Sequence, residues 1–305
     1  MDFITSFLSS DVRTAMPILI AALGLVYSER AGVVNIGAEG IMLIGALASF
    51  TGSYYTGNAW AGMGTAVLSG LLIGLAFAFL VVTVKANQTV VGAALNIFGS
   101  GLSITLNRVI FGISGTPHAV DVFKNVPIPV LSKIPVLGDI LFNHNIWVYI
   151  IVAGVFVANY VLFKTEMGLR IRAVGENPKA CDTLGISVPR IRYGTILFST
   201  AMCGLAGGYM SIAQLNFFIE GMVSGRGYIA LAAVVFGKWN PLGVLMAVLV
   251  FGAGEAVQSK LAAMHTGIPM QFTQMIPYIL TILALIGLVG KTQGPAASGK
   301  PYIKE

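Results

Sequence analysis

The chain has 305 residues, of which 56% are hydrophobic and only 10% are charged, and its mean hydropathy is +0.85. Soluble domains carry about 25% charged residues, so this composition excludes a soluble enzyme or a soluble DNA-binding protein and indicates an integral membrane protein. The net charge of +6 then reflects Lys and Arg retained on the cytoplasmic side of a membrane, and no nucleic-acid partner is expected.

Apolar runs of about 20 residues can cross a bilayer as helices. The sequence predicts an all-α polytopic membrane bundle with about nine crossings (8–10) that forms a single domain over residues 1–305. The run at 227–237 is barely half a span, so it is either a crossing or one limb of a broken or re-entrant helix. In chain order, the expected crossings are 14–28, two within 40–84 on either side of a turn at 51–58, 86–107, 145–163, 193–219, 227–237, 241–258 and 272–290.

Two stretches are too polar to lie in the membrane. Residues 112–144 contain four prolines, whereas residues 164–192 are rich in Lys and Arg. The positive-inside rule places 164–192 in the cytoplasm and 112–144 outside as an external loop. Counting crossings from these loops places the N-terminus outside and the basic tail, 291–305, in the cytoplasm.

A short helix is predicted inside the 164–192 loop. Asn177 is a good N-cap residue, Pro178 stands at the first helical position, and Gly185 ends the helix. A helix of about two turns is not stable alone, so the membrane domain or a partner must hold it. From these residues alone, an ordinary solvated loop is the alternative.

Three motifs resemble those of one membrane-protein family. Residues 175–186 (GENPKACDTLGI) are similar to the coupling-helix segment of ABC importer permeases of the branched-chain amino acid, ribose and nucleoside type. Residues 28–43 (SERAGVVNIGAEGIML) resemble a signature near the start of the nucleoside and simple-sugar permeases, and residues 225–243 (GRGYIALAAVVFGKWNPLG) resemble their later half. The likeness covers roughly 14–289. Cys181 stands where a small residue such as Ala is expected, which is a mild departure.

The resemblance implies a permease subunit of an ATP-binding-cassette importer in the bacterial cell membrane. Two membrane subunits, preferably a related sister pair but alternatively a homodimer, would sit on two cytoplasmic ATPase subunits and receive substrate from an extracytoplasmic binding protein. The expected substrate is a nucleoside, with simple sugars and branched-chain amino acids as alternatives. The residues expected to couple to the ATPase are Gly175, Glu176, Asn177, Pro178, Lys179, Ala180, Asp182 and Gly185.

Such a permease is not an enzyme and needs no cofactor, because its partner subunit hydrolyses the ATP. The sequence agrees with this role, since it contains no Walker A motif. An ion-coupled secondary transporter is the competing hypothesis, with Glu39 or Glu255 as the carrier of a proton or sodium ion. That class has no need of an ATPase-docking helix. An intramembrane enzyme is disfavoured, because the expected spans hold no catalytic constellation, and the three histidines show no metal-ligand spacing.

Polar residues inside the expected spans serve either bundle support or a transport path. Glu39, with Asn35 one turn earlier, lies in an apolar segment, where an ionised acid is costly unless it faces the bundle or water. Amide side chains can hydrogen-bond a base or sugar hydroxyls, but hydrogen bonds between helices are the preferred interpretation. The polar candidates are Asn35, Glu39, Asn96, Gln214 and Asn216. Phe217, near the outer end of its expected span, is a further candidate that either gates the path or lies at the membrane interface.

A faint internal repeat is also present. Residues 37–48 (GAEGIMLIGALA) echo residues 225–236 (GRGYIALAAVVF). An ancient duplication is one explanation, and chance similarity between two glycine-rich apolar stretches is the other.

Overall fold

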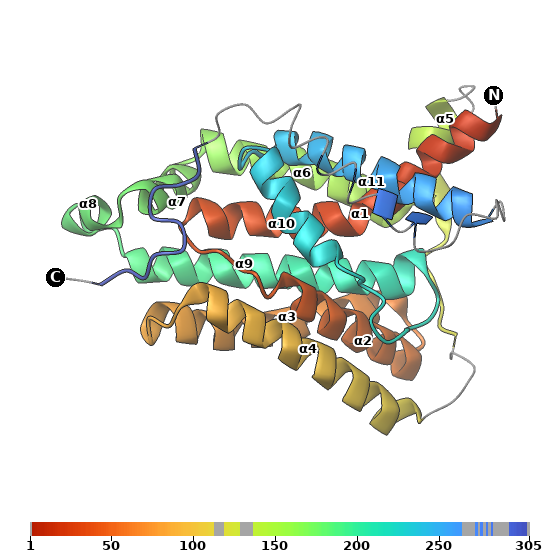
Figure 1. The fold of residues 1–305 in the computed structure, drawn as a ribbon, viewed down its shortest axis with the longest axis horizontal. Coiled ribbons are helices and arrows are strands. Elements are labelled where there is room, and N and C mark those ends of the chain that lie inside the picture. Colours follow the sequence, from red (N-terminus) through yellow and green to blue (C-terminus); the bar gives the residue numbers. More distant parts are fainter. Residues whose placement is uncertain are drawn as a thin grey trace.

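The computed structural model describes residues 2–112, 119–128, 137–263 and 293–303, together with a few positions between 272 and 282. Almost every element within these ranges is a helix, which confirms the all-α prediction. The helices run largely along the long axis of the molecule (Figure 1). In chain order they are α1 (Asp2–Arg30), α2 (Ala38–Thr56), α3 (Ala59–Ala78), the π-helical turn η1 (Phe79–Thr83), α4 (Gln88–Phe111), α5 (Leu137–Leu141), α6 (Ile146–Lys164), α7 (Glu166–Glu176), α8 (Pro178–Thr183), α9 (Val188–Gly208), the π-helical turn η3 (Tyr209–Gln214), α10 (Arg226–Phe236) and α11 (Pro241–Ala263).

Six helices within the described residues are long and apolar enough to cross a bilayer. They cover Thr5–Arg30, Ala59–Thr83, Gln88–Phe111, Ile146–Lys164, Val188–Gln214 and Pro241–Leu261. The prediction of nine crossings is therefore not confirmed. Helix α10 has 11 residues and is about 17 Å long, too short to cross, and most of the expected crossing at 272–290 lies outside the described residues.

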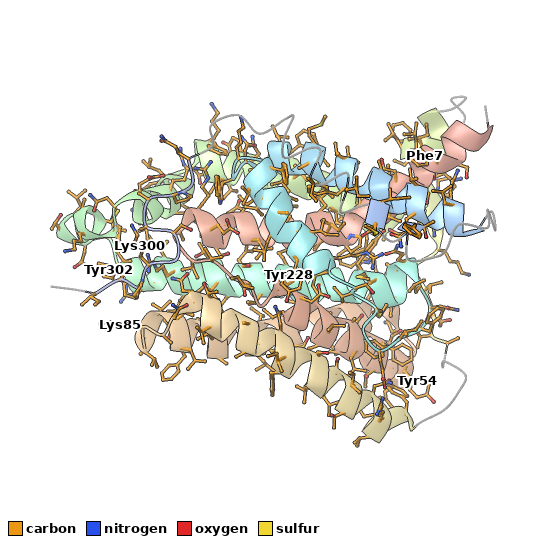
Figure 2. The ribbon with its side chains drawn as sticks, in the orientation of Figure 1. Phe7, Tyr54, Lys85, Tyr228, Lys300 and Tyr302 are labelled. Carbon is orange, nitrogen blue, oxygen red and sulfur yellow. The ribbon has the colours of Figure 1, made fainter. Side chains whose placement is uncertain are left out.

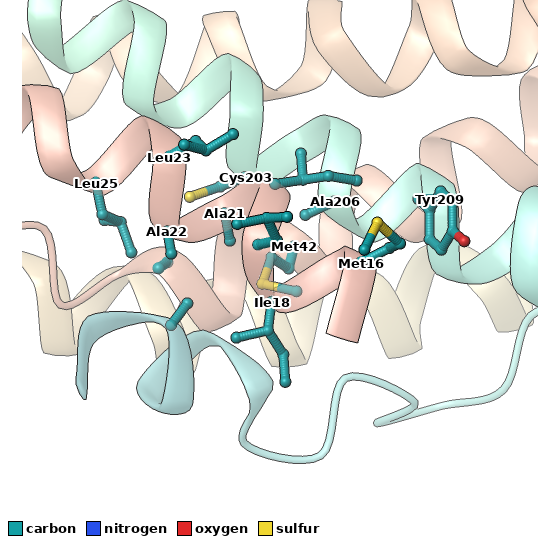
Figure 3. Packing of buried hydrophobic residues seen from close by; sticks show 14 of the residues in the cluster. Met16, Ile18, Ala21, Ala22, Leu23, Leu25, Met42, Cys203, Ala206 and Tyr209 are labelled. Carbon is teal, nitrogen blue, oxygen red and sulfur yellow. The ribbon is translucent and has the colours of Figure 1, made fainter. Parts of the chain in front are cut away.

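Helix α1 lies inside the bundle, and its side chains from residue 15 to residue 29 are all buried. Helices α6, α9, α10 and α11 pack around it. Figure 3 shows Leu23 of α1 near Cys203 of α9, and Met16 near Tyr209. A helix that is apolar on all sides is covered either by other helices or by lipid, and for α1 the neighbouring helices provide the cover.

Helix α2 is enclosed by α3, α4 and α9. Glycines allow this close packing, as they do between helices in lipid. A Cβ on Gly45 of α2 would lie 2.6 Å from the Cα of Gly204 in α9, and one on Gly99 of α4 would lie 2.6 Å from the Cα of Gly40. Side chains at these positions would push α2 away from its neighbours.

The expected external loop is only partly described. Within residues 119–128 and 137–145, strands β1 (Asn125–Pro127) and β2 (Asn143–Asn145) pair antiparallel, with Val126 opposite His144. This ribbon lies at the end of the bundle opposite α8 (Figure 1). The expected cytoplasmic loop at 164–192 is more ordered than predicted, because α7 and α8 occupy much of it.

Candidate functional site

Glu39 connects the beginnings of two helices that are far apart in the sequence. The Gly225 N–H donates to its Oε1 at 2.8 Å, and the Gly227 N–H donates to its Oε2 at 2.8 Å. Backbone N–H groups at a helix start lack helical partners, and the helix dipole favours a negative charge there. Glu39, in the first turn of α2, therefore caps α10, a helix that begins 187 residues further along the chain, at Arg226.

Asn96 of α4 binds the same region from the other side. Its Oδ1 accepts from the Gly40 N–H at 2.9 Å, and its Nδ2 donates to the Ile36 carbonyl at 2.9 Å and to the Tyr228 hydroxyl at 2.8 Å. The Asn96 amide thus satisfies backbone groups at the start of α2 and also contacts the first turn of α10. We call Glu39, Asn96, Gly225, Gly227 and Tyr228 the central junction.

The two halves of the faint repeat meet at this junction, since α2 and α10 begin within them. The chain segments that lead into these helices, 31–37 and 215–225, are not helical. Sequence reasoning identified Glu39 and Asn96 as candidates but missed Tyr228. Two features of the sequence could have pointed to Tyr228: its position in one half of the repeat, and its place as a tyrosine inside an otherwise apolar run.

A buried ion pair lies beside the junction. Arg226 Nε donates to Glu255 Oε2 at 3.0 Å, and its Nη2 lies 3.0 Å from the same oxygen. The Glu255 side chain is only 9% exposed. Because its charge is compensated by Arg226, Glu255 can remain inside the bundle without an ion from solution.

The other residues considered for the transport path, Asn35, Gln214, Asn216 and Phe217, lie in two different environments. Asn35 is completely buried, and its amide has no hydrogen-bond partner among the described residues. Gln214, Asn216 and Phe217 lie at and just after the end of η3, where the Asn216 carbonyl accepts from the Val120 N–H at 2.9 Å. These three residues precede Gly225 in the chain and are not the partners that Glu39 and Asn96 hydrogen-bond.

The short helix predicted after Asn177 is present as α8, at one extremity of the molecule (Figure 1). The Asn177 Oδ1 accepts from the Ala180 N–H at 3.1 Å, and Pro178 occupies the first turn. Gly185, at φ +79°, lies just beyond its C-terminus. This left-handed conformation suits glycine, so the local signals for both ends of the helix are confirmed.

One side of α8 is buried and the other faces outward. Cys181 packs with Val174 and Val188, and burial raises the pKa of its thiol. Ala180 is exposed, and Leu184 is 79% exposed. Among the residues expected to couple to the ATPase, Glu176, Asn177, Pro178, Lys179, Ala180, Asp182 and Gly185 are exposed or partly exposed.

Gly175 differs from those residues, because it is buried. A side chain there would collide with the Arg30 carbonyl. The absence of a side chain at Gly175 lets α7 pack against the end of α1, and its expected part in coupling to the ATPase stays a prediction.

The C-terminal segment 293–303 packs onto the same region. The Ala297 N–H donates to the Gly175 carbonyl at 2.9 Å, and the Gly299 N–H donates to the Gly32 carbonyl at 3.2 Å. Arg192 Nη1 donates to the Lys300 carbonyl at 3.0 Å. The segment thereby links the end of α7 to the non-helical stretch 31–37, which leads directly to the central junction.

A second connection joins the end of α1 to the chain just after α10. Arg30 Nε donates to the Trp239 carbonyl at 2.8 Å, and Trp239 Nε1 donates to Glu29 Oε2 at 2.6 Å. Both Glu29 and Trp239 are buried. The α8 end of the bundle is therefore connected to both ends of α10. The Trp239 contacts reach the C-terminus of α10, and residues 31–37 lead to its N-terminus at the central junction.

These features define a polytopic helical membrane protein. It has a polar junction among its helices, and the basic segment 164–192, which contains α7 and α8, lies at one end. The described residues contain no group of three or more His, Cys, Asp or Glu placed to hold a metal ion. The chain belongs to the family of branched-chain amino acid transport system/permease components, whose model matches residues 8–285. It is a transport subunit and not an enzyme, as the resemblance implied.

Curated relatives match the chain along nearly its whole length. It is 42% identical to the guanosine ABC transporter permease protein NupQ of Bacillus subtilis, over 95% of this chain and 94% of the relative. It is 38% identical to the nucleoside ABC transporter permease protein NupC of Lactococcus lactis, over 94% and 93%. A putative glucose ABC transporter permease of Haloferax volcanii is 32% identical, over 100% and 99%. No solved structure matches significantly.

Proposed function

We propose that this chain is the membrane subunit of an ABC importer and forms the translocation path for a nucleoside. The observation that carries the proposal is the 42% identity, over 95% of the chain, to a permease named for guanosine. The glucose-permease relative supports a simple sugar as the second candidate substrate. An ion-coupled carrier is less well supported, because Glu39 and Glu255 are already engaged by backbone N–H groups and by Arg226.

We propose that α8 is the coupling helix that docks on a separate cytoplasmic ATPase. A six-residue helix is not stable alone, and here α7, α9 and the C-terminal segment hold it in place while Ala180 and Leu184 stay exposed. The 31–37 stretch and the Arg30–Trp239 contact then offer two mechanical routes from α8 to the central junction. ATP is used by the partner, and the permease itself holds no cofactor.

The other partners follow from this assignment. A second permease subunit, preferably a sister and alternatively a second copy, would pack against this chain in the bilayer of the bacterial cell membrane. A substrate-binding protein would deliver the nucleoside at the opposite end, near β1 and β2. Within the junction, we assign Glu39 and Asn96 to support of the helix starts.

ATP-driven nucleoside uptake tests the proposed function. The complete importer, reconstituted in liposomes loaded with ATP and supplied with its binding protein, should accumulate nucleoside after all ion gradients are collapsed. Uptake that persists without ATP and follows a proton or sodium gradient would indicate an ion-coupled carrier. Accumulation of glucose in place of nucleoside would establish the second candidate.

We propose that the N-terminus is outside and the C-terminal segment is cytoplasmic. The start of α1 and the segment 293–303 lie at opposite ends of the bundle (Figure 1), and Lys85 and Lys300 share the end that carries α8 (Figure 2). This clustering of basic residues is typical of the cytoplasmic side.

Cysteine labelling in intact cells tests this orientation. An impermeant thiol reagent should label Asn125→Cys in the exposed strand β1 and should spare Ser298→Cys. Permeabilised cells should label both, and the buried native Cys181 and Cys203 should add little background. Equal labelling of both variants in intact cells would rule out the odd number of crossings.

A further inference from the structure

Tyr228 occupies an unusual position for a tyrosine in a membrane protein. It lies in the first turn of α10 and is 50% exposed. Its contact residue Asn96 is eight residues from the start of the 24-residue helix α4, or about 12 Å along it. Figure 2 shows Tyr228 in the middle of the molecule, between Lys85 at one end and Tyr54 at the other. The ring is therefore inside the membrane region and away from both interfaces.

The hydrogen bonds at this position leave one donor unused. Asn96 uses both N–H donors, to the Ile36 carbonyl and the Tyr228 hydroxyl, while its Oδ1 accepts from Gly40. The Tyr228 hydroxyl accepts from Asn96, so its own proton is free to be donated, and the described residues provide no acceptor for it. Asn96 thus holds the phenol in place while half of the side chain remains exposed.

A lipid-facing position does not account for this arrangement. An unsatisfied hydroxyl donor is costly in hydrocarbon. Non-helical backbone at membrane depth is tolerated only where it is buried in protein or lines a cavity, and the segments 31–37 and 215–225 both end at this junction. In transporters, half-helices that begin near the bilayer midplane typically border the substrate path.

We propose that Tyr228 is a substrate-contact residue, at which the phenol ring stacks on the base of the passing nucleoside and the hydroxyl donates to a base acceptor. Asn96 is the positioning residue for that phenol. An aromatic ring with one directed donor suits a planar heterocycle that carries acceptor atoms, and base stacking on aromatic side chains tolerates different bases. The inference rests on the proposed function and adds that the base of the nucleoside is the part that this residue recognises.

Two variants and a matched control test the proposal. Tyr228→Leu keeps an apolar side chain but removes the ring and hydroxyl, and Tyr228→Phe removes the hydroxyl alone. Tyr160 of α6 is likewise exposed within an apolar span, at 62%, and Tyr160→Leu is the control. Initial uptake of guanosine and of uridine is measured in ATP-loaded proteoliposomes with saturating binding protein, together with basal ATP hydrolysis.

We expect Tyr228→Leu to lower guanosine uptake about tenfold and uridine uptake less, because the smaller base stacks over less area. Tyr228→Phe should lower guanosine uptake about threefold. Basal ATP hydrolysis and subunit assembly should be unchanged, and Tyr160→Leu should behave as the parent.

Normal uptake by both Tyr228 variants would overturn the proposal. So would an equal loss for both nucleosides accompanied by a loss of basal ATP hydrolysis, because that pattern indicates packing. If Tyr228→Leu fails to assemble, unchanged uptake by Tyr228→Phe is sufficient to overturn it. Failure of the proposed function is distinguishable, since the parent importer itself would then transport no nucleoside.

Discussion

Replacing Ala180 with Trp should sharply reduce co-purification of the ATPase with the permease, or uncouple ATP hydrolysis from uptake. Ala180 is exposed, whereas the next residue, Cys181, is buried against Val174 and Val188. A large ring at Ala180 would hold a docking partner away without disturbing the packing that supports α8. Expression, membrane insertion and recruitment of the binding protein should remain near normal.

The same substitution at the other end of the molecule provides the control. Ala119 is exposed and lies next to Val120, which contacts Asn216, so Ala119→Trp should leave ATPase binding intact. Asn177→Ala should give an intermediate effect, because loss of an N-cap costs about 0.5–2 kcal/mol. Normal ATPase binding and transport by Ala180→Trp would show that α8 is not the coupling helix.

Replacing Glu39 with Gln should weaken the central junction but leave measurable transport. Both carboxylate oxygens accept backbone N–H donors, whereas a Gln amide offers one acceptor and turns its NH2 group toward the second donor. An unsatisfied buried donor costs about 1–3 kcal/mol, so the variant should show a lower thermal midpoint and slower uptake. Both are measured on the purified, reconstituted complex.

Glu166→Gln is the matched control for this experiment. Glu166 pairs with Arg170 at an exposed position, and surface ion pairs contribute little, so its stability and uptake should match the parent. Complete loss of transport by Glu39→Gln in a well-assembled complex, with a pH-dependent rate in the parent, would instead favour a coupling-ion role for Glu39.

The sequence by itself determined the features that depend on neighbouring residues. Hydrophobic length predicted helices, and each expected crossing within the described residues contains an α-helix, although residues 215–219 of the run at 193–219 are not helical. The sequence also predicted both ends of α8, because the signals act within one or two helical turns. These signals are the N-cap residue Asn177, Pro178 in the first turn and Gly185 after the last turn. The shortness of α10 was also visible, since its 11 residues are fewer than a span requires.

Only the tertiary structure decided which distant groups meet. No local signal connects Glu39 with Gly225, because an acid in an apolar segment can be satisfied by any unpaired donor that packing brings to it. Likewise, Tyr228 resembles any tyrosine in an apolar helix until Asn96 is seen to hold its hydroxyl. The docking of residues 293–303 against Gly175 and Gly32 also depends on backbone groups, which are the same in every residue except proline. Their pairing is therefore determined by how the helices pack, through contacts between parts of the chain that are distant in sequence.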